Sequence, residues 1–507
     1  MRMSDRSMRS ETLGQGAPTA MNPQTIKQSS PDPLVQIANF LRRRAMRWRL
    51  LRHGIELIES RDPLIYQFTA VLFVILAIAF SVAPIINSLM GRMNKDYDLW
   101  QRTGAIVATG GSIYPTDPHR LFPFMYPPAA AVMMAPISGL PKPLFVAIMV
   151  LIQTLAWAFC IYASVKLATG QFKAGHPLLY MLPSLFVIPF VSDMYLLGQP
   201  ALLLLALSLG AFLALRRQRP LLAGFLVATA TAMKAYPIIL IGYFIYRKES
   251  RATIAIIASV AFYLTIFPLS YRTGEQSQQD LKLWARGMLF KYDDHSIAQR
   301  PDRSFSFKNQ SLQATVHRLS RPVLADGEKD RSWTVNLTNL NFKQSNCLVL
   351  ASVVGLGLFT MWSWWGKGQP LHPLQDSINC EQSMSLMLTV MLAPLSFNYS
   401  YVWLIFPFTF LISIVVDSGR SKSQRNSAAR TLIASVALLS LSILSQRGSA
   451  ANGNIFFAGL VAFIGLGLWE RRGTFFEQAQ AKLINVQSKP HVLKNHPKSR
   501  RNRARAS

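Results

Sequence analysis

Residues 65–90, IYQFTAVLFVILAIAFSVAPIINSLM, constrain the fold of this chain more than any other stretch, because they contain no charged side chain. About 20 apolar residues in a helix are enough to cross the hydrocarbon core of a bilayer. The stretch therefore predicts a transmembrane helix. Similar apolar runs follow at about 144–168, 177–197, 200–215, 220–246, 252–269, 346–365, 383–397, 401–416, 431–445 and 455–469. Together they predict an all-α protein that crosses a membrane many times.

Positive charge is concentrated at the two ends of the chain and in short loops between the apolar runs. The formal net charge is +29. The basic segments are LRRRAMRWRLLRH (41–53), RRQR (216–219), YRKESR (246–251), RSKSQR (420–425) and HPKSRRNRARAS (496–507). Basic arms can bind nucleic acid, but Lys and Arg beside transmembrane ends mark the cytoplasmic face. We therefore expect cytoplasmic termini, membrane lipid as a partner of the N-terminal basic segment, and no nucleic-acid partner.

The chain divides into three regions by composition. Residues 1–62 form a basic N-terminal region, and its first half, rich in Ser, Pro, Gln and Gly, is expected to be disordered. Residues 63–470 form the membrane domain, with about 10 to 12 transmembrane helices, and 471–507 form a basic cytoplasmic tail. If the first helix runs outward, two large loops at about 91–126 and 271–345 share the extracytoplasmic face.

The apolar run at 220–246 has a basic segment at each end, and both segments have the composition of cytoplasmic loops. At about 1.5 Å per residue, this run is too short for two full crossings. The KAYP segment at 234–237 interrupts it, because Pro237 disfavours a helical conformation at the residue before it. A short helical hairpin, broken at this segment, fits these constraints.

Ionisable side chains in or near a bilayer are costly, so they usually pair, line water or bind a ligand. On the outer face the candidates are the acids Asp96, Asp98, Asp117 and Asp193 and the bases Arg102, His119, Lys234, His317 and Arg318. An acid opposite fixed positive charge at a membrane surface suits a reaction on an anionic lipid.

Each of these candidates also has a purely structural interpretation. Asp96 and Asp98 could cap the helix that DLWQRTGAIV predicts. Lys234 could extend its amine to the membrane surface. The segment NQSLQATVHRL at 309–319 reads as the start of an amphipathic helix, whose basic residues could simply be solvated.

Six segments, taken in order, resemble glycosyltransferase family 87, the polyprenol-phosphate-mannose-dependent α-mannosyltransferase-like group. The resemblance implies an all-α polytopic membrane protein with the GT-C type glycosyltransferase fold. The segments are DYDLWQRTGAIVATGGSIYP (96–115), FMYPPAAAVMMAPISGLP (124–141), LLGQPALLLLALSLGAFLAL (196–215), LLAGFLVATATAMKAYPIILI (221–241), KNQSLQATVHRL (308–319) and LAPLSFNYSYVWLIFP (392–407). Each alone is mostly apolar and unspecific, whereas their order and spacing are fairly specific.

The resemblance also implies roles for individual residues. Asp96 matches the catalytic carboxylate of the first outer loop, with Asp98 as the second choice, and Lys234 and Arg318 are expected to bind the donor phosphate. The expected substrate-binding residues are Tyr126, Gln199, Asn309, Gln310 and His317. The sequence departs from the family at SFNYS (396–400), where many members carry histidines.

The implied reaction transfers a hexose, with mannose as the first candidate, from a polyprenyl phosphate to a glycan or glycolipid at the outer face of the cell membrane. A phosphate leaving group needs positive charge rather than a general acid. The acceptor hydroxyl needs a base, so one carboxylate gives inversion. We expect no cofactor, and no metal despite the spacing of Asp96 and Asp98. A transporter or flippase of a lipid-linked sugar is the alternative, although the internal repeats of transporters are not evident. A non-catalytic scaffold is a third possibility.

Overall fold

The computed structural model of this protein describes residues 63–117, 122–172, 176–300, 303–326, 333–365 and 374–487, with side chains up to residue 471. All of these residues belong to the unit Arg61–Ser507. The N-terminal region 1–62, His119 and the last part of the basic tail, 488–507, lie outside the described residues. Within the described part the chain is helical, and its β contacts are isolated bridges.

Seven helical segments among the described residues are long and apolar enough to cross a membrane. They are α2 (Pro63–Leu89), α5 (Lys142–Thr169), α11 (Ser250–Thr265) with η2 (Phe267–Ser270), α14 (Phe342–Trp364), η4 (Asn398–Leu404) with α16 (Ile405–Val416), α17 (Lys422–Leu444) and the first part of α19 (Asn454–Gln487). The protein is therefore an all-α, multi-pass membrane protein, as the sequence predicts.

An eighth span is formed if α6 (Leu178–Phe186) and α7 (Ile188–Leu197) cross together, with a bend of 68° between them. The bend coincides with a proline in the first turn of α7, Pro189, which lacks an amide hydrogen and disfavours helix at the residue before it. The bend turns the last part of α7, which carries Asp193 and Tyr195, away from the direction of α6.

The remaining helices are shorter or more polar. The apolar ones are α4 (Pro128–Ser138), α8 (Ala201–Arg216), α9 (Pro220–Met233) and η1 (Tyr236–Leu240) with α10 (Ile241–Tyr246). The others are α3 (Asp96–Ala108), α12 (Gly274–Trp284), η3 (Ala285–Leu289), α13 (Leu312–Ser320), α15 (Leu374–Leu392) and α18 (Gln446–Ala451). Three of the runs predicted as spans fall on α8, on α9 with α10, and on α15, which explains why the sequence predicts more spans than the seven or eight long ones.

The chain between α8 and α11 forms the helical hairpin predicted from the KAYP segment. Gly224, near the start of α9, lies so close to the start of α11 that an added Cβ would be 2.4 Å from the carbonyl oxygen of Ala252. Further along both helices, the hydroxyls of Thr229 and Tyr263 are 3.0 Å apart. α9 and α11 therefore run parallel, so the chain must turn back between them. Lys234, which follows α9 directly, lies at the turn.

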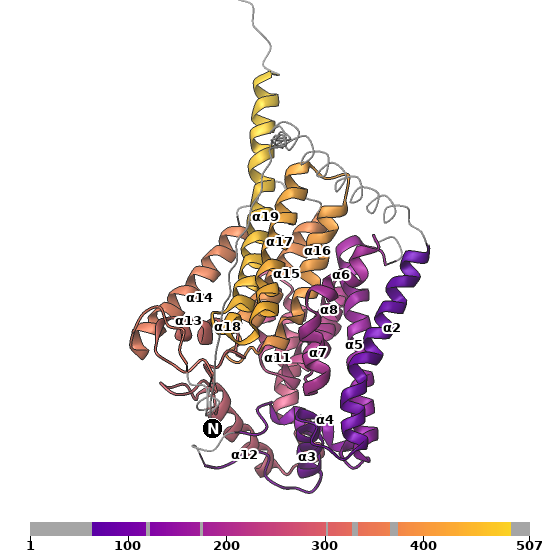
Figure 1. The fold of residues 1–507 in the computed structure, drawn as a ribbon, viewed down its shortest axis with the longest axis vertical. Helices are drawn as coiled ribbons and strands as arrows, with labels where there is room; N and C mark the ends of the chain where they lie inside the picture. Colours follow the sequence, from indigo (N-terminus) through magenta and orange to yellow (C-terminus); the bar gives the residue numbers. More distant parts are fainter. Residues whose placement is uncertain are drawn as a thin grey trace, which may run out of the picture. The chain divides into compact units, whose positions relative to one another are not determined.

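The two large polar loops meet at the end of the bundle that holds α3, α4 and α12, at the bottom of Figure 1. The guanidinium of Arg272 donates to the carbonyl oxygen of Gly111 at 2.8 Å, and the amide of Gln276 donates to that of Gly110 at 3.1 Å. We call this region the α3 end. The opposite region, where the basic segments at 216–219, 246–251 and 420–425 contact buried residues of α5 and α15, we call the Arg216 end.

Candidate active site

Asp96 is the first residue of α3, and the buried face of this helix fixes its position. Tyr97 and Trp100, one turn apart, are almost completely buried. The Tyr97 hydroxyl donates to the carbonyl oxygen of Tyr195 at 2.8 Å, and the Trp100 indole donates to that of Gly198 at 3.1 Å. The start of α3 is thereby attached to the end of α7.

Gly198 makes this close approach possible. It ends α7 in the left-handed region, at φ 74°, which residues with a side chain rarely adopt. A Cβ at this position would also lie 2.9 Å from Cδ2 of Tyr97. A glycine here lets the chain turn directly beneath α3, so the next residue, Gln199, faces Asp96.

Three side chains form a hydrogen-bonded series at this point. The hydroxyl of Tyr126 donates to Oε1 of Gln199 at 3.0 Å, and the amide nitrogen of Gln199 donates to the carboxylate of Asp96. Tyr126 is itself held by its ring, which packs 4.3 Å from that of Trp100. The series orients the carboxylate and leaves its second oxygen free of this bond.

Burial raises the pKa of the Asp96 carboxyl above its ordinary value. The positive charges of Lys234 and Arg300, the hydrogen bond from Gln199 and the charge of Lys95 act in the opposite direction. A carboxylate with a raised pKa is a stronger base than an ordinary aspartate, which suits proton abstraction from a hydroxyl.

Lys234 lies among three tyrosine rings at the turn of the hairpin. Its ammonium nitrogen is 5.1 Å from the centre of the Tyr399 ring, 5.5 Å from that of Tyr236 and 5.8 Å from that of Tyr126. Cation–π contacts at these distances stabilise the ammonium without neutralising it. Burial lowers the pKa of Lys234 to about 8, while the charge of Asp96 acts in the opposite direction, so the amine is mostly protonated at pH 7.

Two cavities meet at Tyr126, Met125 and Phe397. The larger, of about 440 Å³, has the charged side chains of Lys95, Asp96, Asp193, Arg300, Lys308 and Arg447 in its walls. The smaller, of about 100 Å³, is lined mainly by apolar side chains, among them Trp284, Met288, Leu289 and Leu395, with Lys234 at one side. We call them the polar cavity and the apolar cavity. Asp96 and Lys234 thus lie on either side of Tyr126.

Asp98, the second choice for the catalytic acid, lies in neither cavity wall. One carboxylate oxygen accepts a hydrogen bond from the backbone amide of Asn94 at 2.8 Å, and the other lies 2.8 Å from the ammonium of Lys142. Its contacts attach the start of α3 to the start of α5. Of the other candidates, Asp193 lines the polar cavity, whereas Asp117 and Arg102 are exposed elsewhere.

Asn309 and Gln310 are completely buried and line neither cavity. The Asn309 side chain donates to the carbonyl oxygen of Pro394 at 3.1 Å and accepts from the amide of Ser396 at 3.1 Å. The Gln310 amide donates to the carbonyl oxygen of Ala450 at 2.6 Å. These contacts join the second polar loop to the segments before α16 and α19. Lys308, the residue before them, is the one that reaches the polar cavity.

Arg318 is also completely buried, in α13. It donates to five backbone carbonyl oxygens, those of Phe305, Ser306, Asn309, Ala450 and Ala451. Bonds to so many protein acceptors satisfy the guanidinium internally, and the residue lines neither cavity. The structure therefore keeps Arg318 apart from Asp96 and Lys234.

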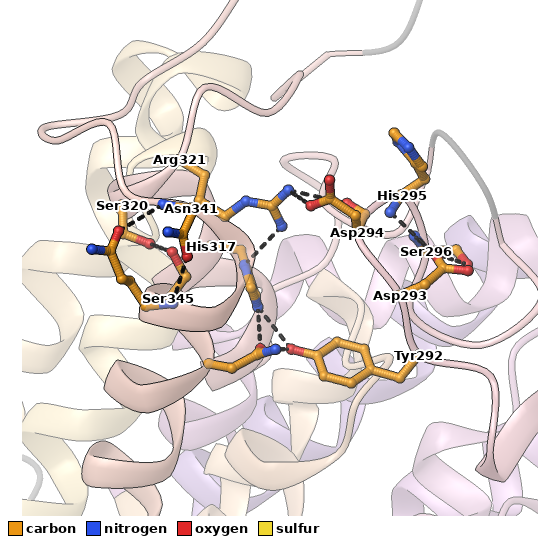
Figure 2. Close-up of polar contacts among 12 residues, drawn as sticks. Tyr292, Asp293, Asp294, His295, Ser296, His317, Ser320, Arg321, Asn341 and Ser345 are labelled. Atoms are coloured by element: carbon orange, nitrogen blue, oxygen red, sulfur yellow. Dashed lines mark hydrogen bonds and ion pairs between the residues drawn. The ribbon is translucent and has the colours of Figure 1, made fainter.

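His317, which the sequence suggested as a substrate-binding residue, lies in the polar cluster of Figure 2. Its Nε2 is 2.8 Å from the hydroxyl of Tyr292 and 3.1 Å from the amide oxygen of Asn346, while its Nδ1 is 3.2 Å from the guanidinium of Arg321. Burial, helped by the charge of Arg321, lowers the pKa of His317 to about 4. The imidazole is thus neutral at pH 7, and it connects the loop before α13 to α14.

Several residues in the polar cavity were not singled out from the sequence: Lys95, Arg300, Lys308, Asn398, Tyr399 and Arg447. Lys95 directly precedes the marked segment that begins at Asp96, and Lys308 is the first residue of the marked segment 308–319, so position in or beside a motif is a usable signal. Arg300 lies in an irregular loop with no periodic pattern. Among the described residues, no group of three or more His, Cys, Asp or Glu side chains is placed to hold a metal ion.

The family model of glycosyltransferase family 87 matches residues 124–380 of the chain. The matched part contains Tyr126, Gln199, Lys234 and Arg300, whereas Asp96 precedes it. No curated protein and no solved structure matches the chain.

Proposed function

The chain belongs to glycosyltransferase family 87, and from this premise we propose that it transfers a hexose, mannose first among the candidates, from a polyprenyl phosphate to a glycan or glycolipid. One observation supports this donor above all. A carboxylate, Asp96, and an ammonium, Lys234, flank the point where a polar cavity meets an apolar one. A lipid phosphate sugar needs both environments, because its prenyl chain is apolar and its phosphate and sugar are polar.

In the proposed reaction, Asp96 takes the proton of an acceptor hydroxyl. The acceptor oxygen forms a bond to C1 of the donor sugar, and the bond between C1 and the phosphate oxygen breaks, leaving its electron pair on that oxygen. The products are the new glycoside and polyprenyl phosphate, and the proton passes from Asp96 to water. Because the attack comes opposite the leaving group, the anomeric configuration inverts.

Negative charge grows on the phosphate as this bond breaks, so fixed positive charge beside it accelerates the step. We assign this role to Lys234 and Arg300. Arg300 replaces Arg318 in the assignment because it lines the polar cavity and its Nε has no hydrogen-bond partner among the described residues. A guanidinium with free donors can bind a phosphate through two parallel hydrogen bonds.

The same proposal orients the protein in the membrane. Basic segments gather at the Arg216 end, and Lys and Arg beside transmembrane ends favour the cytoplasm. The α3 end, with both cavities, then faces outward from the cell (plasma or inner) membrane, and both termini are cytoplasmic. Family membership favours a transferase over the transporter or flippase that the sequence left open.

The direct test uses the full-length protein in lipid nanodiscs, supplied with a synthetic polyprenyl phosphate that carries ¹⁴C-mannose, and membrane lipids as acceptors. We expect a labelled glycolipid with inverted anomeric configuration. We also expect Asp96→Asn to reduce the rate roughly 10²- to 10⁴-fold, the usual contribution of a general base. Retained configuration, or full activity of the variant, would refute the mechanism. Absence of transfer from this donor, and from its glucose counterpart, would refute the proposed donor class.

A further inference from the structure

The polar cavity has a second charged group besides the one at Asp96. Asp193, in α7, is partly buried in its wall, and the charges that act on it most strongly are those of Lys95 and Lys308. The charges that act most strongly on Asp96 are those of Lys234 and Arg300. Lys95 acts on both carboxylates, whereas Lys308 acts on Asp193 and the pair Lys234 and Arg300 acts on Asp96.

Within the described part of the chain, Asp193 has no ion-pair partner that would explain its position by folding alone. Among the residues that the structure describes, neither Asp193 nor Lys95 nor Lys308 forms an ion pair. An ionisable side chain on an apolar helix such as α7 is costly unless it binds something. The polar neighbours of Asp193 are thus available to a ligand.

The backbone of Lys95 gives a second, independent indication. Its φ is 49° and its ψ −119°, a conformation that side-chain-bearing residues rarely adopt. Such strain persists mainly where the residue has a task, since glycine would relieve it. What bears on its ammonium is position: Lys95 is exposed and lines the polar cavity, where a ligand can reach it.

The position of this group separates it from the donor. The apolar cavity, which suits a prenyl chain, adjoins Tyr126 and Lys234, on the Asp96 side. Lys95 and Lys308 are exposed to solvent as well as lining the cavity, so the Asp193 part opens to water. A water-exposed sugar chain would enter from there and place its hydroxyl beside Asp96.

We propose that Asp193, with Lys95 and Lys308, binds the sugar of the acceptor that receives the transferred hexose. This inference rests on the proposed function and specifies its acceptor as a sugar with two neighbouring hydroxyls. Those hydroxyls donate to the two oxygens of Asp193, and the ammonium groups of the lysines donate to oxygens of the same sugar. Asp193 then determines which acceptors are used, while Asp96 performs the proton transfer.

The test measures transfer from polyprenyl phosphate ¹⁴C-mannose to a panel of octyl hexosides, using the full-length protein in nanodiscs. We expect Asp193→Ala and Asp193→Asn to raise the KM for the best octyl hexoside roughly 10- to 100-fold, as for a lost hydrogen bond to a charged group. Hydrolysis of the donor to free mannose, which needs no acceptor sugar, stays within about twofold of wild type for both variants. Asp98→Asn, another acid of the α3 end, serves as the matched control with unchanged KM.

Monodeoxy versions of the same octyl hexoside sharpen the test. Removing a hydroxyl that donates a hydrogen bond to Asp193 should lower the transfer rate of the wild type. The same analogue should cause no further loss of transfer in Asp193→Ala. An identical loss in both proteins would overturn the proposal, and so would an unchanged acceptor KM. Loss of donor hydrolysis in both variants would also overturn it, because Asp193 would then act on the donor.

Failure of the inference and failure of the proposed function give different results. If the wild type transfers mannose to membrane lipids but to none of the octyl hexosides, the acceptor site is wrong and the function stands. If the wild type transfers sugar neither from the mannose donor nor from its glucose counterpart to any acceptor, the proposed function is wrong, and the acceptor site fails with it.

Discussion

The two ends of the helical bundle differ in whether their buried basic residues form ion pairs. At the Arg216 end, Arg420 lies 2.5 Å from the carboxylate of Asp376, and Arg247 lies 3.5 Å from that of Glu381. At the α3 end, Lys234 and Arg300 form no ion pair among the described residues, although a carboxylate is close by. Ion pairs join helices at both ends, as Asp98 with Lys142 does at the α3 end, but at the α3 end Lys234 and Arg300 are left to face a cavity.

This difference in pairing indicates which charges a ligand would bind under the proposed function. A buried ion pair largely cancels the cost of removing its members from water. Charges that line a cavity without such a partner leave that cost uncompensated until a ligand arrives. Paired charges therefore indicate assembly at either end, and the unpaired Lys234 and Arg300 indicate chemistry at the α3 end.

The largest effect on the transfer reaction is expected from a change at Lys234. Replacing it by Gln keeps the size of the side chain but removes the positive charge beside the departing phosphate. We expect kcat/KM for the polyprenyl phosphate donor to fall roughly 10²- to 10³-fold, as when a donor to a developing anion is lost. Steady-state kinetics and a thermal melt check this, and a lowered melting temperature with unchanged kinetics would contradict it.

At the Arg216 end, Arg420→Ala is expected to reduce stability and to leave the transfer kinetics unchanged. The change leaves the buried carboxylate of Asp376 without its partner, which should cost about 3 kcal/mol of unfolding free energy. Transfer kinetics of the surviving folded protein should stay near wild type. Denaturant unfolding in detergent measures the loss of stability. A large rise in the KM for the donor without loss of stability would contradict the division between the two ends.

A smaller effect is expected in the pH dependence of transfer. Asp96 acts as a base only when ionised, so kcat/KM falls as the pH drops through its raised pKa. Gln199→Met removes the hydrogen bond that stabilises the ionised form, so the acid limb should move to higher pH. A pH–rate profile of both proteins measures the shift. No movement, or movement to lower pH, would show that another group titrates.

The smallest effect is expected at Asp98. Its ion pair with Lys142 is partly exposed, and such pairs contribute about 0 to 1 kcal/mol. Asp98→Asn should therefore change kcat/KM by less than about twofold. A loss comparable to that of Asp96→Asn, measured side by side, would exchange the roles assigned to the two acids.

The sequence predicts the fold well because its signals are local. Uncharged runs specify the long helices, and the KAYP segment between two basic segments specifies the hairpin and the position of Lys234. The site depends on tertiary contacts that no local pattern encodes. Arg318 matches a family motif and carries a charge, but it donates to three carbonyl oxygens of the loop before α13 and to two of the distant segment at Ala450 and Ala451. Arg300 reaches the polar cavity from an irregular loop, where neither periodicity nor motif marks it.

The length of the hairpin of α9 and α10 also sets the position of Lys234. One leg begins and the other ends at the Arg216 end, so the length of the legs determines how far the ammonium of Lys234 reaches toward the polar cavity. Removing one helical turn from each leg would withdraw it by about 5.4 Å, beyond hydrogen-bonding reach of a phosphate held near Arg300. The number of residues between the two basic turns would therefore determine how deep in the membrane the proposed donor phosphate is bound.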